Sequence, residues 1–220
     1  MPKLKPETHA ARRTAILDAA EICFARSGFH ATSVQDICKA ANVSSGALYI
    51  YFKSKESLIA GICERNRHEF AERFAMLSSA PDFLSALKAL GGQYLVDEPV
   101  YKRVLCVEIG AEATRNTEIS NLFQSIDRDV ENSFMQLFER LHAEGRIAPA
   151  IEISNLTSIL MMLGDGLFWR RAINPDLDIE ANLKAVVDVI GMLTNPVANE
   201  QPTTPAGTKL SNRNVDEAQT

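Results

Sequence analysis

The stretch from residue 32 to residue 58, TSVQDICKAANVSSGALYIYFKSKESL, restricts the possible folds of this chain more than any other. Its apolar residues recur at helical spacing in two short segments, 33–40 and 45–51. Between them, Asn42 suits a left-handed turn position, and the neighbouring alanines let two helices approach closely. Two short helices joined by a three-residue turn form a helix-turn-helix.

The residues around this segment predict where its helices begin and end. Gly28 is a typical left-handed stop for a preceding helix over 9–27. Thr32 is the predicted N-cap of the second helix, with Gln35 as its capping-box partner. Ser44 is placed to cap the third helix.

The rest of the chain also has helical period and shows little alternation of period two. Ser54 caps a fourth helix that runs to about Leu77, and proline- and glycine-containing breaks separate five more. These five helices are predicted over 82–96, 99–114, 117–143, 153–172 and 178–194. The expected fold is all-α, with about nine helices: an N-terminal three-helix helix-turn-helix head on a larger helical body.

Composition and charge exclude several classes of protein. The chain has 220 residues, is 46% hydrophobic and has a net charge of -5. Residues 1–60 nevertheless hold eight Lys/Arg and five Asp/Glu, so a slightly basic head precedes an acidic body. The longest apolar stretches are too short for a membrane span, and the N-terminus lacks a secretory signal, so a cytoplasmic protein with no membrane partner is expected.

No motif indicates an enzyme, a cofactor or a metal site. The four cysteines include no C-x-x-C pair, and the four histidines are scattered. There is no G-x-S-x-G element and no phosphate-binding glycine loop. A non-enzymatic protein without a cofactor is the prediction.

The segment over residues 10–60 resembles the N-terminal DNA-binding segment of the TetR family of bacterial regulators. Two positions depart from the family pattern: Cys38 stands where Ala is usual, and Asn42 where Gly is usual. The positions that match are Thr32 (or Ser33), Ile37, Ala40, Ala41, Val43, Ser44, Gly46, Leu48, Tyr49, Tyr51, Phe52, Lys55, Glu56 and Leu58.

The resemblance implies two sets of DNA contacts. The phosphate contacts would come from Thr32, Ser44, Tyr49, Tyr51 and Lys55. The base edges would be read by Gln35, Ser45, Gly46, Ala47 and Ile50. Small residues at the start of a recognition helix let it enter the major groove, and tyrosine hydroxyls reach phosphates. One alternative that stays open is Tyr49 as a packed core aromatic. The capping box at Thr32 is a structural signal whether or not Thr32 also contacts DNA.

The resemblance also implies a domain division and a homodimer. The division is a flexible N-terminus (1–8), a DNA-binding domain (9–56), a ligand-binding and dimerisation domain (57–195) and a disordered tail (196–220). The dimer interface is expected in the last two helices, at Ile179, Leu183, Val186, Val187 and Ile190. Packing within one chain is the alternative for these residues.

A ligand pocket is expected in the body. The candidate lining residues are Phe70, Phe74, Tyr94, Glu108, Glu112, Phe123, Met161, Asp165, Phe168 and Trp169. An ordinary core is the alternative for the aromatic members, and an intrahelical ion pair with Arg115 is the alternative for Glu112.

Three functional hypotheses follow from these features. The favoured one is a homodimeric regulator, most often a repressor in this family, which an unknown small apolar or aromatic effector releases from a palindromic double-stranded DNA operator. The second is a DNA-binding protein controlled by a protein partner. The third is a helical ligand carrier or enzyme that merely retains the head.

Overall fold

The structure is a computed structural model, and it describes residues 6–197. Within these residues the chain forms nine α-helices, one π-helical turn and no strand, which confirms the all-α prediction. The helices are α1 (Pro6–Ser27), α2 (Val34–Ala40), α3 (Ser45–Tyr51), α4 (Lys55–Ser79), α5 (Phe83–Gly92), η1 (Gln93–Asp97), α6 (Val100–Ala113), α7 (Thr117–Ala143), α8 (Ile153–Ile173) and α9 (Ile179–Thr194).

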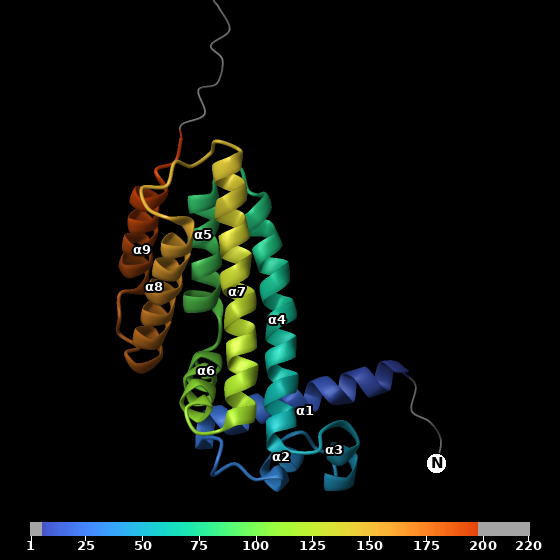
Figure 1. Cartoon of the computed structure of the whole chain (residues 1–220). Coiled ribbons are helices and arrows are strands. Elements are labelled where there is room, and N and C mark those ends of the chain that lie inside the picture. The colour runs from blue at the N-terminus through green and yellow to red at the C-terminus, as the bar shows by residue number, and fades with distance from the viewer. Residues whose placement is uncertain (1–5, 198–220) are drawn as a thin grey trace, which may run out of the picture.

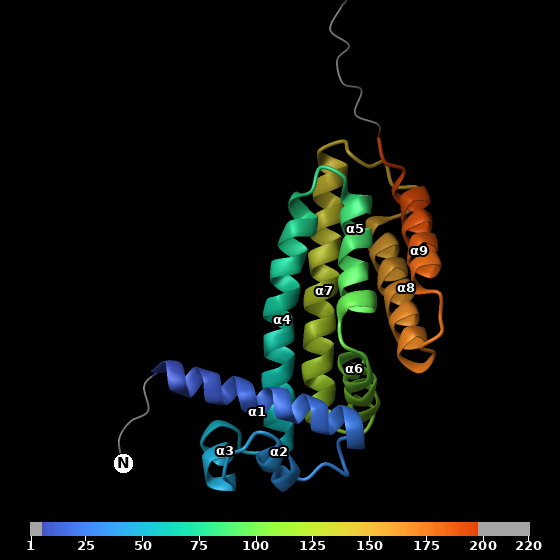
Figure 2. The same cartoon turned by 180° about the vertical axis from the view of Figure 1, so that it is seen from behind.

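The helices form a small head and an elongated body (Figure 1). α1, α2 and α3 gather at one end, where α1 lies across the first turns of α4 (Figure 2). The two long helices α4 and α7 run side by side through the body, α5 packs on α4 and α8 packs on α7. α9 forms the outer edge of the body, against α5 and α8. α6 lies between the two parts, in contact with α1 on one side and with α7 and α8 on the other. The head is therefore joined to the body through α4 and α6.

The turns of the head follow the sequence signals with one exception. Gly28 and Asn42 have positive φ values of 79° and 51°, as their turn positions require. The predicted cap at Thr32 was wrong: Ser33 is the N-cap of α2, and its capping-box partner is Asp36 rather than Gln35. Ser33 Oγ accepts from the Asp36 amide, while Asp36 accepts from the Ser33 amide at 2.9 Å. The Asp36 carboxylate also accepts from Ser33 Oγ at 2.6 Å, and this bond, followed by the one from the Ser33 amide, lowers the pKa of Asp36.

The fifth predicted helix, over 82–96, is interrupted. The α-helical part ends at Gly92, and residues 93–97 form a π-helical turn in which the Glu98 amide donates to the Gln93 carbonyl at 3.0 Å. Such turns are frequent at functional sites. Here the turn directs Tyr94 and Leu95 toward the interior of the body.

The two parts have separate hydrophobic cores. The core of the head joins α1–α4 to Leu105, Ile109 and Ile119 of the body. The core of the body is built from α4, α5, α7, α8 and α9. α1 begins at Pro6, three residues earlier than expected, so residues 6–8 of the expected flexible N-terminus (1–8) are helical. Residues 1–5 of that segment, and residues 198–220 of the expected disordered tail (196–220), lie outside the described residues.

The apolar face chosen as the dimer interface of α9 lies inside the chain. Ile179, Leu183, Val187 and Ile190 are all buried within the protomer. The side chain of Leu183 sits against α5, where a Cβ added at Gly91 would lie 2.6 Å from its Cδ1. These four residues are therefore packed within one chain, where α5 and α8 contact α9, as in the alternative of intrachain packing.

None of the described helices combines the length and the apolar character needed to cross a membrane.

Candidate DNA-binding helix and ligand cavity

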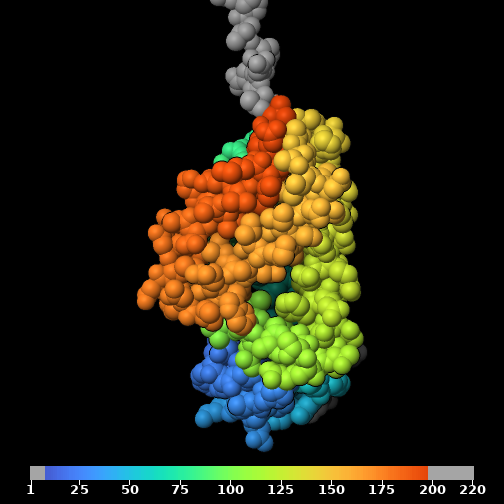
Figure 3. Space-filling model, turned by 60° about the vertical axis from the view of Figure 1, so that its left-hand side comes forward, coloured from blue at the N-terminus to red at the C-terminus, as the bar shows by residue number. Residues whose placement is uncertain are grey.

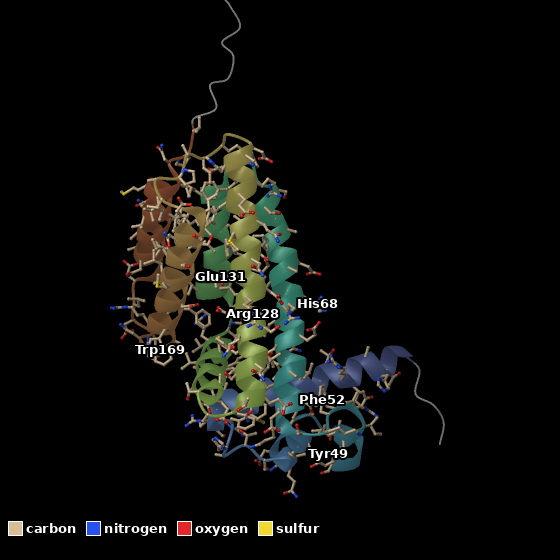
Figure 4. The ribbon with its side chains drawn as sticks, viewed as in Figure 1. Tyr49, Phe52, His68, Arg128, Glu131 and Trp169 are labelled. Atoms are coloured by element: carbon tan, nitrogen blue, oxygen red, sulfur yellow. The ribbon has the colours of Figure 1, made fainter. Side chains whose placement is uncertain are left out.

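The recognition helix α3 divides cleanly into a buried face and an exposed face. Leu48 and Phe52 are 1% and 4% exposed and anchor the helix in the core of the head. Tyr49 and Ile50 are 44% and 69% exposed. Figure 4 labels Tyr49 at this end of the molecule. The alternative of Tyr49 as a core aromatic is excluded. An isoleucine this exposed on a short helix suits contact with an apolar group such as a thymine methyl.

The first turn of α3 is open enough for a close approach. A Cβ added at Gly46 would meet nothing within 4 Å, and Ser45 is exposed. Ser44 caps the helix by accepting from the Ala47 amide at 3.2 Å, which leaves its own hydroxyl proton available. Gln35 of α2 is exposed as well. The five predicted base-edge residues thus share one end of the molecule with Ser44 and Tyr49.

Thr32 and Lys55 are engaged within the protein. Thr32 is 2% exposed, and its hydroxyl donates to the carbonyls of Gly28 and Cys23 at 2.7 and 3.0 Å. The Lys55 ammonium donates to the carbonyls of Phe29, Thr32 and His30 at 2.5, 3.0 and 3.4 Å. It also lies 4.4 Å from the centre of the Phe29 ring. In this structure neither side chain has a donor left for a phosphate.

Tyr51 is supported by α1. Its ring centre lies 4.4 Å from that of His9, in a tilted arrangement. The His9 ring is thereby placed beside α3, although nothing in the sequence pattern had connected the two. This pairing restricts where the Tyr51 hydroxyl can reach.

Glu108 and Glu112, which were expected in the pocket, instead lie at the junction of head and body. Glu108 Oε1 accepts from the Phe29 amide at 2.8 Å, directly after α1. Glu112, 2% exposed, accepts from Arg115 at 3.0 Å and lies 2.9 Å from His30. The intrahelical pair with Arg115 is therefore confirmed. Both carboxylates face the loop after α1, because that face of α6 packs on the head.

A cavity of about 790 Å³ opens in the body between α4, α6, α7 and α8. Figure 3 shows its entrance as a dark hollow between the orange surface of α8 and the yellow-green surface of α7. Its volume lies in the range of sites for small molecules. Trp169 lies outside it, on the outer face of α8 and 50% exposed. The predicted residues that do line it are Phe70, Phe74, Tyr94, Phe123, Met161, Asp165 and Phe168.

Charged groups form a network at the α4–α6 side of the cavity. Arg73 and Lys102 contact the Glu98 carboxylate at 2.6 and 3.2 Å, and Lys102 also reaches Glu69. Burial raises the pKa of Glu98, but hydrogen bonds from Arg73 and Lys102 outweigh burial and lower the pKa below its usual range. These four groups neutralise one another.

Two other groups of the cavity wall have raised pKa values. Burial, and secondarily the charge of Asp127, raises the pKa of Asp165. Burial, followed by the charge of Asp165, raises the pKa of the Cys106 thiol to about 11. Cys106 lines the cavity, so protein surrounds its thiol while the side chain keeps accessible surface, unlike the three buried cysteines. A thiol with a raised pKa is a poor nucleophile at neutral pH.

Sequence reasoning missed Arg103, which lines the cavity and is only 3% exposed. The available signal was its position between Lys102 and the apolar run VLCV (104–107) of α6. A buried arginine is uncommon unless it is paired.

Comparisons with known proteins agree with this arrangement. The sequence model of the family described as "Bacterial regulatory proteins, tetR family" matches residues 16–62. The transcriptional regulator UidR of Escherichia coli K12 is 30% identical over 155 residues, which cover 70% of this chain and 79% of that protein.

Two solved structures extend the likeness to most of the chain. GusR of Salmonella enterica has a TM-score of 0.74 and 26% identity, covering 87% of this chain and 98% of its own. The SmeT–triclosan complex has a TM-score of 0.74 and 21% identity, covering 90% and 99%, and it shows a shared fold. With its helix-turn-helix head and helical body, the chain belongs to the TetR family of bacterial transcriptional regulators.

Proposed function

We propose that this protein is a homodimeric repressor that binds a palindromic operator and is released from it by a small apolar or aromatic effector. The observation that carries the proposal is the double role of α6. Leu105, Cys106 and Ile109 of this helix line the cavity, while Glu108 and Glu112 hold the loop after α1. A ligand that favours one position of α6 therefore biases the position of the head.

The DNA-binding surface is the exposed end of the head. Its base-reading residues are Gln35, Ser45, Gly46, Ala47 and Ile50. Its phosphate contacts come from Ser44, Tyr49 and Tyr51, with Thr32 and Lys55 holding the loops that position them. Because Ile50 is apolar, direct hydrogen-bond readout is sparse, and recognition depends strongly on DNA shape.

The effector site is the cavity. Its wall is largely apolar and carries several phenylalanines, so a compact aromatic or aliphatic molecule suits it. The structurally similar SmeT was solved with triclosan, a small molecule, which supports an effector of this class.

The dimer surface is the outer face of α8 and α9. Large apolar side chains stay exposed there in the protomer: Met162, Trp169, Ile173, Val189 and Met192. Several large apolar side chains exposed on two neighbouring helices favour a protein partner. A second copy of the chain is the occupant because a palindromic site needs two recognition helices related by a two-fold axis.

The test is fluorescence anisotropy of the purified protein on DNA from upstream of its own gene, measured as a function of salt. Nanomolar-class binding is expected, with log affinity falling steeply with log salt. Tyr49→Ala should weaken binding by roughly tenfold or more, because it removes a contact at the rim of the recognition helix.

The control is His68→Ala, which changes an exposed residue of α4 well away from α3 (Figure 4). This variant should bind like the unaltered protein. If neither upstream DNA nor a selection from genomic DNA yields a site bound above the nonspecific level, the proposed function is wrong.

A further inference from the structure

Arg103 is a buried cation in the wall of the cavity without a carboxylate partner. It sits in the first turns of α6 and is 3% exposed. Its Nη1 donates to the backbone carbonyl of Glu98 at 2.6 Å, while Nε is buried and has no hydrogen-bond partner. Among the described residues no carboxylate lies within ion-pair distance of it. An unpaired buried guanidinium is costly, and folds normally avoid it.

The surroundings of Arg103 add to this cost. The charges that act on it are those of Arg171, a second guanidinium near the end of α8, and of Glu98. Burial first, and then the charge of Arg171, lowers the pKa of Arg103. Arg171 donates to the backbone carbonyls of Pro175 and Leu177, and its Nε has no partner either. An anion beside Arg103 would relieve both the desolvation and the repulsion.

Other ionic groups of the cavity wall are already neutralised or exposed. Glu21 pairs with Arg65, and Asp129 pairs with Arg67. Glu98 and Glu69 share Arg73 and Lys102. Two carboxylates lie outside these pairs. Asp127 and Asp165 are both exposed residues, and partial burial of the Asp165 carboxyl raises its pKa, which favours its neutral form. Arg103, in contrast, is 3% exposed. The charge that lacks compensation in the interior is therefore positive.

We propose that Arg103 binds an anionic group of the effector, so that the effector is a small molecule with an apolar or aromatic body and one anionic group, such as a carboxylate or a sulfonate. This inference rests on the proposed function, because it names the chemistry of the ligand of the same cavity. The planar guanidinium, with Nε and a terminal nitrogen on one edge, suits the two oxygens of such a group.

The test compares two fluorescent probes on the full-length protein. Anilinonaphthalene sulfonate and phenylnaphthylamine share one aromatic body, and only the first carries an anionic group. A purely apolar cavity would prefer the neutral probe, because burying an unpaired anion is unfavourable. The unaltered protein is expected to bind the sulfonate more tightly, at one site per protomer, whereas tighter binding of the neutral probe would overturn the proposal.

Substitution then assigns the preference to one side chain. Arg103→Gln should weaken sulfonate binding by roughly tenfold or more and change neutral-probe binding less than about twofold. Arg103→Lys should restore part of the loss. Arg128→Gln is the matched control, because Arg128 is an exposed arginine of α7 outside the cavity wall (Figure 4). This substitution should leave the affinity for both probes unchanged. Equal losses for both probes in Arg103→Gln would contradict the proposal.

The location of the probe is checked at Cys106, the exposed thiol of the cavity. Bound sulfonate should slow the alkylation of Cys106, measured by peptide mass spectrometry under alkaline conditions, and an unchanged rate would contradict binding there. If Arg103→Gln does not fold by circular dichroism, the probe preference of the unaltered protein and the Arg103→Lys result decide the question.

The outcome is separable from that of the DNA experiment. A protein that binds its operator but prefers the neutral probe retains the proposed function and loses this inference. A protein that prefers the anion through Arg103 but binds no DNA site keeps its ligand chemistry and loses its role as a repressor.

Discussion

At the scale of single residues, Lys55 joins the recognition end of the molecule to the fold. Its ammonium has three protons, and the structure offers three backbone carbonyls from the loop after α1 to receive them. The Phe29 ring covers the same ammonium. This lysine therefore ties the start of α4 to the start of α2, and its effect on DNA binding passes through the loop that it holds.

Replacing Lys55 should consequently lower stability without removing a phosphate contact. We expect Lys55→Met to reduce the free energy of unfolding by about 1–2 kcal/mol, because charge-assisted hydrogen bonds are lost. The slope of log affinity against log salt on operator DNA should stay unchanged. Urea unfolding and salt-dependent anisotropy measure the two quantities.

Lys53→Met is the matched control for this experiment. Lys53 is exposed and makes one bond, to the Tyr49 carbonyl at 2.8 Å, so its loss should change stability by less than about 0.5 kcal/mol. A salt slope that becomes shallower by about one in Lys55→Met would show that Lys55 contacts a phosphate after all.

At the scale of helices, Gly61 sets how closely α4 crosses the head. A Cβ at this position would lie 2.8 Å from Cε1 of Phe52 and 3.0 Å from Cδ2 of Leu17. Phe52 ends α3 and Leu17 lies in α1, and both are almost fully buried. Neither side chain can move without disturbing the core of the head.

Gly61→Ala should therefore destabilise the protein by about 1–3 kcal/mol, the usual cost of overpacking a core. Gly110→Ala is the comparison, because nothing lies within 4 Å of the added Cβ there and α6 continues through the position. It should be neutral or should stabilise by about 0.5–1 kcal/mol, because alanine is the better helix former. Urea unfolding of the two variants tests whether Gly61→Ala is the less stable one. Equal free energies of unfolding would contradict the close packing of α4 against the head at Gly61.

The positions of the helices could be predicted from the sequence because the signals for turns and caps are local. What each helix face contacts could not be predicted in this way. Gly28, Asn42 and Ser44 mark turns and caps through their own backbone preferences, so the helices of the head were placed correctly. Glu108 and Glu112 were assigned to the pocket because helical spacing shows that two residues share a face without showing what that face contacts. The apolar face of α9 was likewise assigned to a partner, although α5 covers it.

At the scale of the whole molecule, the burial of one face of α9 within the protomer moves the proposed dimer surface to the opposite, exposed face of the same helix. The buried face packs on α5, so the residues available to a second copy are the exposed ones, including Met192 at 76% and Val189 at 41%. Met162 and Trp169 continue this surface on α8 at 65% and 50%. Trp169 is the single tryptophan of the chain, so its fluorescence reports directly on this surface.

Met192→Glu should convert the dimer to a monomer, because a carboxylate buried in an apolar interface has no compensating partner. Sedimentation velocity should show the lower mass, and the emission of Trp169 should shift to longer wavelength as its ring becomes solvated. Affinity for a palindromic operator should fall by at least roughly a hundredfold, because the second half-site is no longer held by the same particle.

Met76→Glu is the control for this substitution. Met76 is 69% exposed on α4, so it matches Met192 in type and exposure but lies outside the α8–α9 surface. This variant should sediment as a dimer and keep the Trp169 emission of the unaltered protein. If Met192→Glu and Met76→Glu behave alike, the two protomers pair through another surface. The distance between the two recognition helices would then be set elsewhere than by α8 and α9.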